Sequence, residues 1–300
     1  EFQACSNIRF VGQPGGTVLD GNGATWWGFP GIGYLLIGEN RPRLLTISSC
    51  TNVLVENLIL KNSPYWTFWA PSVHGLEVRN SVVSARRDSS DSHDVYDLSA
   101  FNTDGFDFTG RDIWVHDCTV WNQDDCVAVK DDTQNVLVER VSASGLGVTI
   151  GSIGGSTVRN VTFRDIVMPH TYKGIYMKFR SSGLVEDILY QNITMHAVEQ
   201  YAIWIGPAQQ SDSDNLCAAH PCSLCWPLLP WAQCNAPLNG LYRNVTLRDV
   251  TVLGATNSPG LIFGNTTTPM ENVVFDNVVV QGAGDKPFGT NYKCEGVASG

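Results

Sequence analysis

Short stretches of alternating apolar and polar residues recur along the whole chain. Each stretch holds an Asn or Asp, an apolar–polar alternation and a β-branched pair. The copies begin at Asn52, Leu76, Ile113, Val136, Val161, Ile188, Val245 and Val273. Alternation over roughly four to eight residues is typical of half-buried strands. Since no stretch carries a helical period, the pattern predicts an all-β protein.

A second short strand follows most of these units. These strands begin at Gly105, Cys126, Gly147, Gly174, Tyr201 and Gly260. Strands this close together, without crossover helices, can pair in parallel only if the chain winds into a coil. We therefore expect residues 1–300 to form one domain, a right-handed single-stranded parallel β-helix. A β-sandwich is the alternative, but hairpin signals are sparse and the internal repeat argues against it.

Two segments interrupt the repeat. Residues 85–100 are polar and rich in Ser and Asp, and residues 207–239 hold a cysteine cluster and several prolines. We expect both segments to be loops that flank a groove, where coiled folds place function.

Composition and charge exclude several classes of protein. Hydrophobic residues make up 43% and charged residues 16% of the chain, which is typical of a folded protein. The net charge of −10 argues against a nucleic-acid partner, and no apolar run is long enough to span a membrane. The sequence has no initiator Met and no signal peptide, as expected of a mature or trimmed chain.

Cysteines and glycosylation sequons together indicate a secreted, extracellular protein. The sequons begin at Asn160, Asn192, Asn244 and Asn265. Cys5 and Cys50 each precede a strand start, so adjacent coils should bring them together as a disulfide. The other disulfide candidates are Cys118, Cys126, Cys217, Cys222, Cys225 and Cys234. The last four crowd one loop with His220, where disulfides are favoured over a zinc site. One of the nine cysteines must remain free or pair outside the chain.

Two acidic motifs lie about one repeat apart: Asn102-Thr-Asp104 and Gln123-Asp-Asp125. Stacking should put Asp104, Asp124 and Asp125 on one face of neighbouring coils. Three carboxylates in one patch cannot all ionise freely, so at least one pKa should rise. An acid beside a base is the chemistry of glycosidic bond hydrolysis. A single Asp often caps a turn instead, but two such motifs one coil apart favour a functional role.

The sequence resembles glycoside hydrolase family 28, the polygalacturonases and their relatives, over nearly its whole length. The matching motifs are Asn102–Asp107, Gln123–Val129, Gly145–Gly154, Leu19–Trp27 and Lys61–Pro64. The resemblance implies a pectinase-like right-handed parallel β-helix that needs no metal or cofactor. It also implies that Asp124 is the general acid and that Asp104 and Asp125 activate water. The family inverts the anomeric centre, so the carboxyls should be separated by roughly 6.5–9.5 Å.

The chain departs from the family pattern at two positions. The family's Gly-His-Gly reads Gly145-Leu146-Gly147, and its Arg-Ile-Lys reads Tyr176-Met177-Lys178. In polygalacturonases the replaced cations help to hold the uronate carboxylate. His170 and His196 are weak candidates to replace the missing histidine.

Other residues are expected to bind substrate. Arg180 shares an alternating face with Lys178, so it could replace the missing arginine or be a solvated charge. Trp204 alternates with two isoleucines and should face the groove, where an indole can stack on a sugar. The substrate-binding candidates are Lys178, Arg180, Tyr176, Trp204, Asn102 and Gln123.

Three functions compete. The first is an extracellular inverting hydrolase, expected to be a monomer, that cleaves pectin-like polysaccharide of the galacturonan or related uronic-acid type. The second is a catalytically silent β-helix that serves as a structural or carbohydrate-binding component of a cell wall or extracellular matrix, as a repeated subunit. The third is a calcium-dependent lyase, since an Asp cluster can bind Ca²⁺, but the family motifs argue against it.

Overall fold

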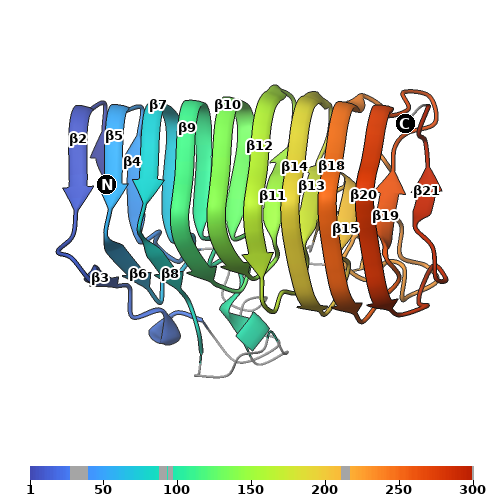
Figure 1. Cartoon of the computed structure of the whole chain (residues 1–300), viewed down its shortest axis with the longest axis horizontal. Helices are drawn as coiled ribbons and strands as arrows, with labels where there is room; N and C mark the ends of the chain where they lie inside the picture. The colour runs from blue at the N-terminus through green and yellow to red at the C-terminus, as the bar shows by residue number, and fades with distance from the viewer. Residues whose placement is uncertain (28–39, 88–92, 94–96, 211–216, 299–300) are drawn as a thin grey trace.

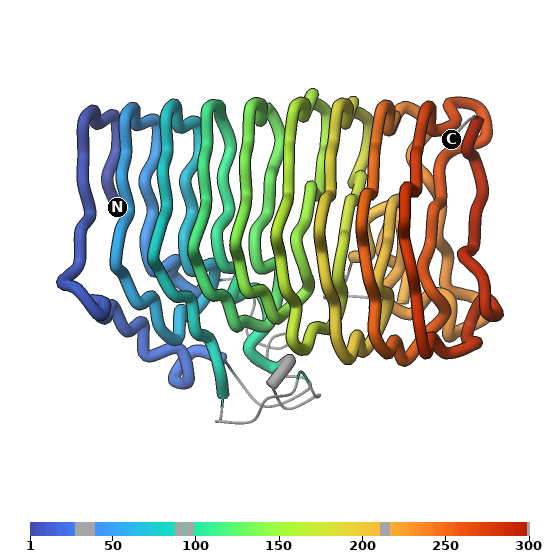
Figure 2. The backbone as a smooth tube through the Cα atoms, viewed as in Figure 1, coloured from blue at the N-terminus to red at the C-terminus, as the bar shows by residue number. Residues whose placement is uncertain are grey.

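The chain forms a right-handed parallel β-helix, as predicted. A computed structural model describes residues 1–27, 40–87, 93, 97–210 and 217–298. Successive coils stack side by side from the N-terminal to the C-terminal end (Figures 1 and 2). Neighbouring strands of the stack pair in parallel.

Three rows of parallel strands form the walls of the coil, and the long strands bend from one row into the next. The first row contains β1 (Phe2–Gln3), β4 (Leu45–Ser48), β7 (Phe68–Arg79), β9 (Phe106–Trp121), β10 (Val127–Ser144), β11 (Val148–Ile153), β13 (Ile175–Phe179), β15 (Ile203–Pro207), β19 (Gly260–Phe263) and β21 (Lys293–Glu295). The second contains β2 (Ser6–Val11), β5 (Thr51–Glu56), β7, β9, β10, β12 (Thr157–Met168), β14 (Gly183–Val198), β18 (Gly240–Ala255) and β20 (Glu271–Ala283). The third begins with β3 (Thr17–Asp20), β6 (Leu58–Lys61) and β8 (Val82–Ser84) and continues in the end of β9.

The remaining elements are short and lie outside these walls. They are the 3₁₀ helices η1 (Gly23–Thr25) and η2 (Asp97–Ala100) and the strands β16 (Gln209–Gln210) and β17 (Cys222–Ser223). Within the described residues, no helix is both long and apolar enough to cross a membrane.

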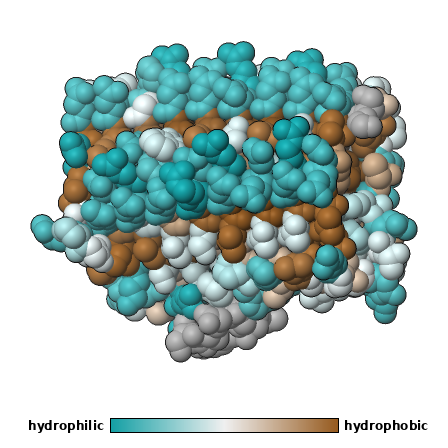
Figure 3. Space-filling view, in the orientation of Figure 1, coloured by the Kyte–Doolittle hydropathy of each residue, from teal (hydrophilic) through white to brown (hydrophobic). Residues whose placement is uncertain are grey.

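The hydrophobic core fills the interior of the coil. Inward-facing residues at matching register form columns, and one column runs through Val53, Leu76, Ile113, Val136, Val161, Ile188, Val245 and Val273. All of these side chains are buried. The alternating polar positions face outward, and Figure 3 shows hydrophilic side chains gathered in rows across the coils. The alternation therefore creates one continuous core.

The recurrent Asn and Asp residues mark the corners of the coil. Asp112, Asn135 and Asn160 have φ angles of 58°, 57° and 53°, in the left-handed region that Asn and Asp tolerate better than other side chains. At the same corner, one coil holds Gly75 with a φ of 72°. Asn135 Nδ2 donates to Asp112 Oδ1 at 3.0 Å, and Asn160 Nδ2 donates to Asn135 Oδ1 at 2.9 Å. The left-handed backbone conformation at this corner thus favours Asn, Asp or Gly. The Asn side chains also form hydrogen bonds to the preceding coil.

Three of the predicted glycosylation sequons start at such corners. Asn160, Asn192 and Asn244 are exposed, and each amide donates to an oxygen on the preceding coil. Asn265 instead donates to the carbonyl of Ala236 at 2.9 Å. An amide has two hydrogens, so one N–H of each side chain is left for a glycan. Glycosylation at these positions stays a prediction.

Disulfides form at the predicted places in the coil edge and the cysteine-rich loop. The pairs are Cys5–Cys50, Cys217–Cys225 and Cys222–Cys234. The proposed use of Cys118 and Cys126 in disulfides is wrong, because both are free thiols buried in the core. Cys294 is free and exposed.

Replacing Asn135 by Val should destabilise the fold more than replacing it by Gly. A β-branched side chain in the left-handed region costs about 1–2 kcal/mol, whereas Gly adopts that conformation freely. Both variants lose the same hydrogen bonds to the neighbouring coils. Chemical denaturation should therefore show a free energy of unfolding lower by about 1–2 kcal/mol for Asn135→Val than for Asn135→Gly. Equal losses would contradict a backbone role for the corner.

Candidate active site

The register of two strands brings the acidic motifs together. Phe106 of β9 pairs with Val127 of β10, so Asp104 and Asp125, each two residues earlier, meet on adjacent coils. Asp104, Asp124 and Asp125 each offer a carboxylate oxygen, and these three oxygens lie within 4.8 Å of one another. Stacking of adjacent coils thus brings the three carboxyls together.

The expected separation of roughly 6.5–9.5 Å between the carboxyls is not observed, since one oxygen from each of the three residues lies within 4.8 Å of the other two. Parallel strands are spaced about 4.8 Å apart, which sets the distance between residues at matching register. The close approach therefore follows from the fold itself.

Asp124 is the most open of the three carboxyls. It is half-buried, whereas Asp104 and Asp125 are buried. Its Oδ2 accepts from the backbone N–H and the Nδ2 of Asn102, at 3.2 and 3.4 Å. Its Oδ1 accepts from the backbone N–H of Asp125 at 2.8 Å. Asn102, expected to bind substrate, thus holds Asp124 in place.

Asp125 is fixed by a lysine and a threonine. Lys178 Nζ donates to both carboxylate oxygens of Asp125, at 2.8 and 3.1 Å, and Thr149 Oγ1 donates to Oδ1 at 2.9 Å. Lys178 is only 9% exposed. The ammonium of Lys178 is thus paired with Asp125, and a contact of Lys178 to substrate stays a prediction.

The sequence reasoning missed a fourth carboxyl and a second lysine. Asp107 is fully buried, and Lys130 Nζ lies 3.4 Å from Asp107 Oδ2, 3.6 Å from Asp104 Oδ2 and 3.8 Å from Asp125 Oδ2. Both residues belong to strands whose Phe and Val neighbours face the core. The alternation would have placed both side chains outward, on the face of the carboxylates.

Burial dominates the electrostatics of the cluster. It raises the pKa of Asp104 well above its usual range, and the charges of Asp107 and Asp124 raise it further. Burial also raises the pKa of Asp107 to about 7 against the opposing charge of Lys130. The pKa of Asp124 is raised by burial and by the neighbouring charge of Asp125. The cluster can therefore retain protons at a pH where an ordinary aspartate has lost them.

Trp204 does not line an open groove, which corrects the sequence prediction. It faces away from the core residues Ile203 and Ile205 as expected, but its side chain is fully buried. Its Nε1 donates to the carbonyl of Pro207 at 2.9 Å, and its ring packs edge-on to Trp226. The disulfide-linked segment after β15 covers the indole.

Tyr176 is also enclosed rather than available to a substrate. It is 2% exposed, and its hydroxyl accepts from the backbone N–H of Gln209 at 3.3 Å. Lys173 Nζ lies 4.0 Å from the centre of its ring and donates to Gln209 Oε1 at 2.8 Å. Tyr176 therefore anchors the chain that follows β15.

Gln123 is enclosed by the protein and not open to a substrate, which corrects its assignment as a substrate contact. It is 1% exposed, and its Oε1 lies 2.9 Å from Nδ1 of His93. His93 comes from the polar 85–100 segment; residues 88–92 and 94–96 of that segment lie outside the described residues. The segment thus reaches the strand end that carries Asp124.

The remaining candidates lie at the edges of the site. Arg180 is exposed and directly follows β13, and its predicted contact with substrate stays a prediction. Leu146 is half-buried, and its backbone N–H donates to the carbonyl of Asp124 at 2.7 Å. His170 pairs with Glu199 at 2.5 Å, and His196 is half-buried in β14. A replacement of the missing family histidine by either residue stays a prediction.

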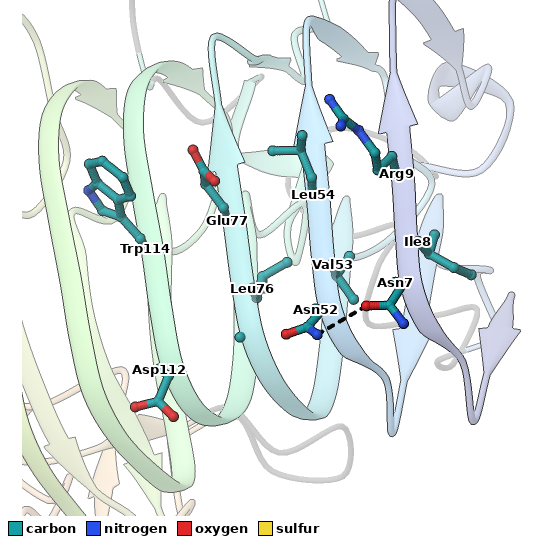
Figure 4. A pocket seen from close by; sticks show the side chains of 11 residues that line it. Asn7, Ile8, Arg9, Asn52, Val53, Leu54, Leu76, Glu77, Asp112 and Trp114 are labelled. Atoms are coloured by element: carbon teal, nitrogen blue, oxygen red, sulfur yellow. Dashed lines mark hydrogen bonds between the residues drawn. The ribbon is translucent and has the colours of Figure 1, made fainter.

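A separate groove of about 510 Å³ runs across β2, β5, β7 and β9. Figure 4 shows Arg9, Leu54, Glu77 and Trp114 along it. Its lining includes none of the clustered carboxyls, so the groove is distinct from the candidate site.

Stability should fall as the pH rises from about 4, the usual pKa of Asp, to about 7, the pKa of Asp107. In this window the folded chain holds protons that the unfolded chain has released, so deprotonation favours unfolding. Asp107→Asn should reduce the fall, and Asp132→Asn, on an exposed corner, should not. Thermal midpoints between pH 4 and 8 measure this. A thermal midpoint that rises between pH 4 and 7 would contradict this prediction. So would the same dependence of the midpoint on pH in the parent, Asp107→Asn and Asp132→Asn.

Comparisons with known proteins agree with the fold and the motifs. The model of glycosyl hydrolases family 28 matches residues 2–225. A probable endopolygalacturonase D of Aspergillus flavus is 33% identical over 293 residues, which cover 90% of this chain and 52% of the relative. The chain thus spans about half the length of the curated relatives that it matches.

Solved structures share the fold at low sequence identity. An exopolygalacturonase from Thermotoga maritima has a TM-score of 0.64 at 19% identity, covering 94% of this chain and 71% of that chain. An endo-xylogalacturonan hydrolase from Aspergillus tubingensis has a TM-score of 0.59 at 21% identity, covering 100% and 80%. Because the family model matches most of its length, the chain belongs to family 28 of the glycosyl hydrolases.

Proposed function

We propose that the chain is an extracellular glycoside hydrolase that cleaves pectin-like polysaccharide of the galacturonan or related uronic-acid type. The observation that carries this proposal is the meeting of Asp104, Asp124 and Asp125 within 4.8 Å on one face of the coil. The raised pKa of Asp124 keeps on this residue the proton that an acid catalyst needs. The disulfides are typical of a secreted chain.

In this proposal Asp124 is the general acid. Its half-exposed carboxyl can reach a glycosidic oxygen, and its proton passes to that oxygen as the bond to the anomeric carbon breaks. The N–H groups of Asn102 and Asp125 hold the carboxyl and stabilise the carboxylate left behind.

Asp104 and Asp125 act as the base in the same step. A water molecule attacks the anomeric carbon from the opposite face, and its proton passes to one of these carboxylates. Lys178 and Thr149 fix Asp125 as a hydrogen-bond acceptor. Attack from that face inverts the anomeric centre, which is the outcome that the family resemblance implies. The approach of the carboxylate oxygens to within 4.8 Å is nearer the spacing of retaining enzymes, so the configuration of the first product tests this step.

The class of substrate rests on the named activities of the relatives. These are called endopolygalacturonases or an endo-xylogalacturonan hydrolase, which indicates a galacturonan backbone. In this chain Leu146 and Tyr176 replace two family cations, and Lys178 is bound to Asp125. Arg180 is an exposed cation near the end of β13, and we propose that it contributes to recognition of the uronate.

The same replacements favour a second candidate function. A β-helix with few free cations beside its carboxylates could bind polysaccharide without cleaving it. Half-buried Leu146, next to Asp124, is the observation that supports this alternative.

Asp124→Asn should strongly reduce the rate of hydrolysis. Removing a general acid lowers the rate by about 10²–10⁴-fold. Release of reducing ends from a panel of pectic polysaccharides measures the activity, and NMR of the first product reports its anomeric configuration. Asp132→Asn is the matched control. If the parent binds a pectic polysaccharide but cleaves none, the alternative function is supported and the hydrolase proposal fails.

Leu146→His should increase activity on polygalacturonate relative to a neutral galactan. A charged hydrogen bond to the uronate contributes about 1.5–3 kcal/mol, which corresponds to at least about a tenfold gain in kcat/KM. Leu146→Met keeps the size of the side chain without a charge and serves as the control. If the ratio of activity on polygalacturonate to activity on galactan is the same in Leu146→His and Leu146→Met, the side chain at this position does not contact the uronate.

A further inference from the structure

Lys130 lies among the carboxyls of the cluster, although it is outside the motifs that carry the family resemblance. Its Nζ is 3.4–3.8 Å from oxygens of Asp107, Asp104 and Asp125. Its side chain is 14% exposed, and the ammonium is 4.9 Å from the centre of the Trp66 ring. The lysine is thus enclosed by carboxylates and an indole, both of which attract a cation.

The contacts of Lys130 are Coulombic rather than hydrogen bonds. Charged N–H···O bonds are usually about 2.7–2.9 Å long, shorter than any of these distances. Both oxygens of Asp107 and Oδ1 of Asp104 are buried without a hydrogen-bond partner among the described residues. Buried carboxylates with so few hydrogen bonds need a nearby positive charge to ionise. Lys130 is placed to supply that charge.

Lys130 and Lys178 lie next to different carboxylates of the cluster. Asp104, Asp107 and Asp125 face its ammonium, with Asp124 and the ammonium of Lys178 farther away. Within the described part of the chain, Lys178 donates hydrogen bonds only to Asp125. Lys130 is therefore the cation that acts on Asp104.

Building on the proposed function, we propose that Lys130 is a positioning residue whose ammonium favours the ionised form of Asp104, the form that can accept the proton of the attacking water. Lys130 itself stays charged, because its neighbours outweigh the cost of burial. Burial alone would lower the pKa of Lys130. The carboxylates of Asp107 and Asp104 raise this pKa by a larger amount, so the net change is an increase. The same ammonium opposes the rise in the pKa of Asp104 that burial causes.

The sign of the effect on catalysis follows directly. Without the ammonium, Asp104 should hold its proton to a higher pH, so the base becomes available only at a higher pH. The acidic limb of the pH dependence of kcat should therefore shift to higher pH. Because Lys130 acts through Asp104 and does not touch the substrate in this proposal, KM should change little.

The experiment compares the parent chain with Lys130→Met, Lys130→Gln and Lys130→Arg. Lys61→Met, at an exposed lysine paired with Asp20, is the control for loss of a surface charge. The pH profile of kcat on polygalacturonate is measured together with carbon-13 NMR titration of Asp carboxyls, in which Asp104→Asn assigns the Asp104 signal. The NMR titration does not depend on activity, so it tests Lys130 even if the parent hydrolyses nothing.

In Lys130→Met and Lys130→Gln, the midpoint of the acidic limb of kcat and the midpoint of the Asp104 NMR titration should both shift to higher pH by about one unit or more. The KM of both variants should stay within about twofold of the parent value. Lys130→Arg should restore both midpoints. Unchanged Asp104 titration in a folded Met or Gln variant would overturn the proposal. It would also fail if Lys130→Arg matched Lys130→Met, or if a chelator abolished the parent's activity and Ca²⁺ restored it, since a bound ion would then supply the charge.

Discussion

In-register stacking of parallel strands is the constraint on which the rest of this structure depends. Each residue faces its equivalent on the next coil at a spacing of about 4.8 Å. Inside the coil the rule places Val, Ile and Leu in continuous columns. At the corners it links Asn135 to its neighbours above and below. At the start of β9 and β10 the same rule places Asp104 beside Asp125.

The carboxylate cluster shows what this constraint costs electrostatically. Several buried carboxyls at the distance between two strands repel each other and resist ionisation. Two lysines offset the repulsion in different ways: Lys178 donates hydrogen bonds to Asp125, and Lys130 lies between three carboxylates. The retained protons and the two ammoniums make acid and base roles possible on neighbouring coils. Catalysis and stability thus make opposite demands on Asp104, since a base must ionise whereas burial favours the protonated form.

Much of the architecture could be predicted from the sequence, because a repeat converts local alternation into long-range contacts. The period alone indicates the coil, the pairing of Cys5 with Cys50 and the meeting of the acidic motifs. The side of the wall on which Trp204 lies was also predictable from its isoleucine neighbours. Asp107 and Lys130 could have been found by the same alternation.

The features that the sequence did not predict depend on segments outside the repeat or on choices among partners. The chain after β15 folds back over Trp204 and Tyr176, and no periodic signal shows this. His93 reaches Gln123 from a polar insertion in the same way. Lys178 could equally have faced a substrate, and only the positions of Asp125 and Thr149 show that it is engaged within the protein. The repeat therefore determines the walls of the coil, whereas the insertions determine which side chains on its outer face stay accessible to a substrate.

The most direct test of this account is whether the stacked cluster holds a proton at near-neutral pH. Infrared difference spectroscopy of the folded parent between pH 6 and pH 9 detects the carbonyl stretch of a protonated carboxyl. The account predicts a carboxylic acid band at pH 6 that becomes weaker as the pH rises through about 7 and is smaller in Asp107→Asn. A spectrum without such a band would mean that all carboxyls are already ionised at pH 6, and it would contradict the claim that coil stacking creates an acid beside a base.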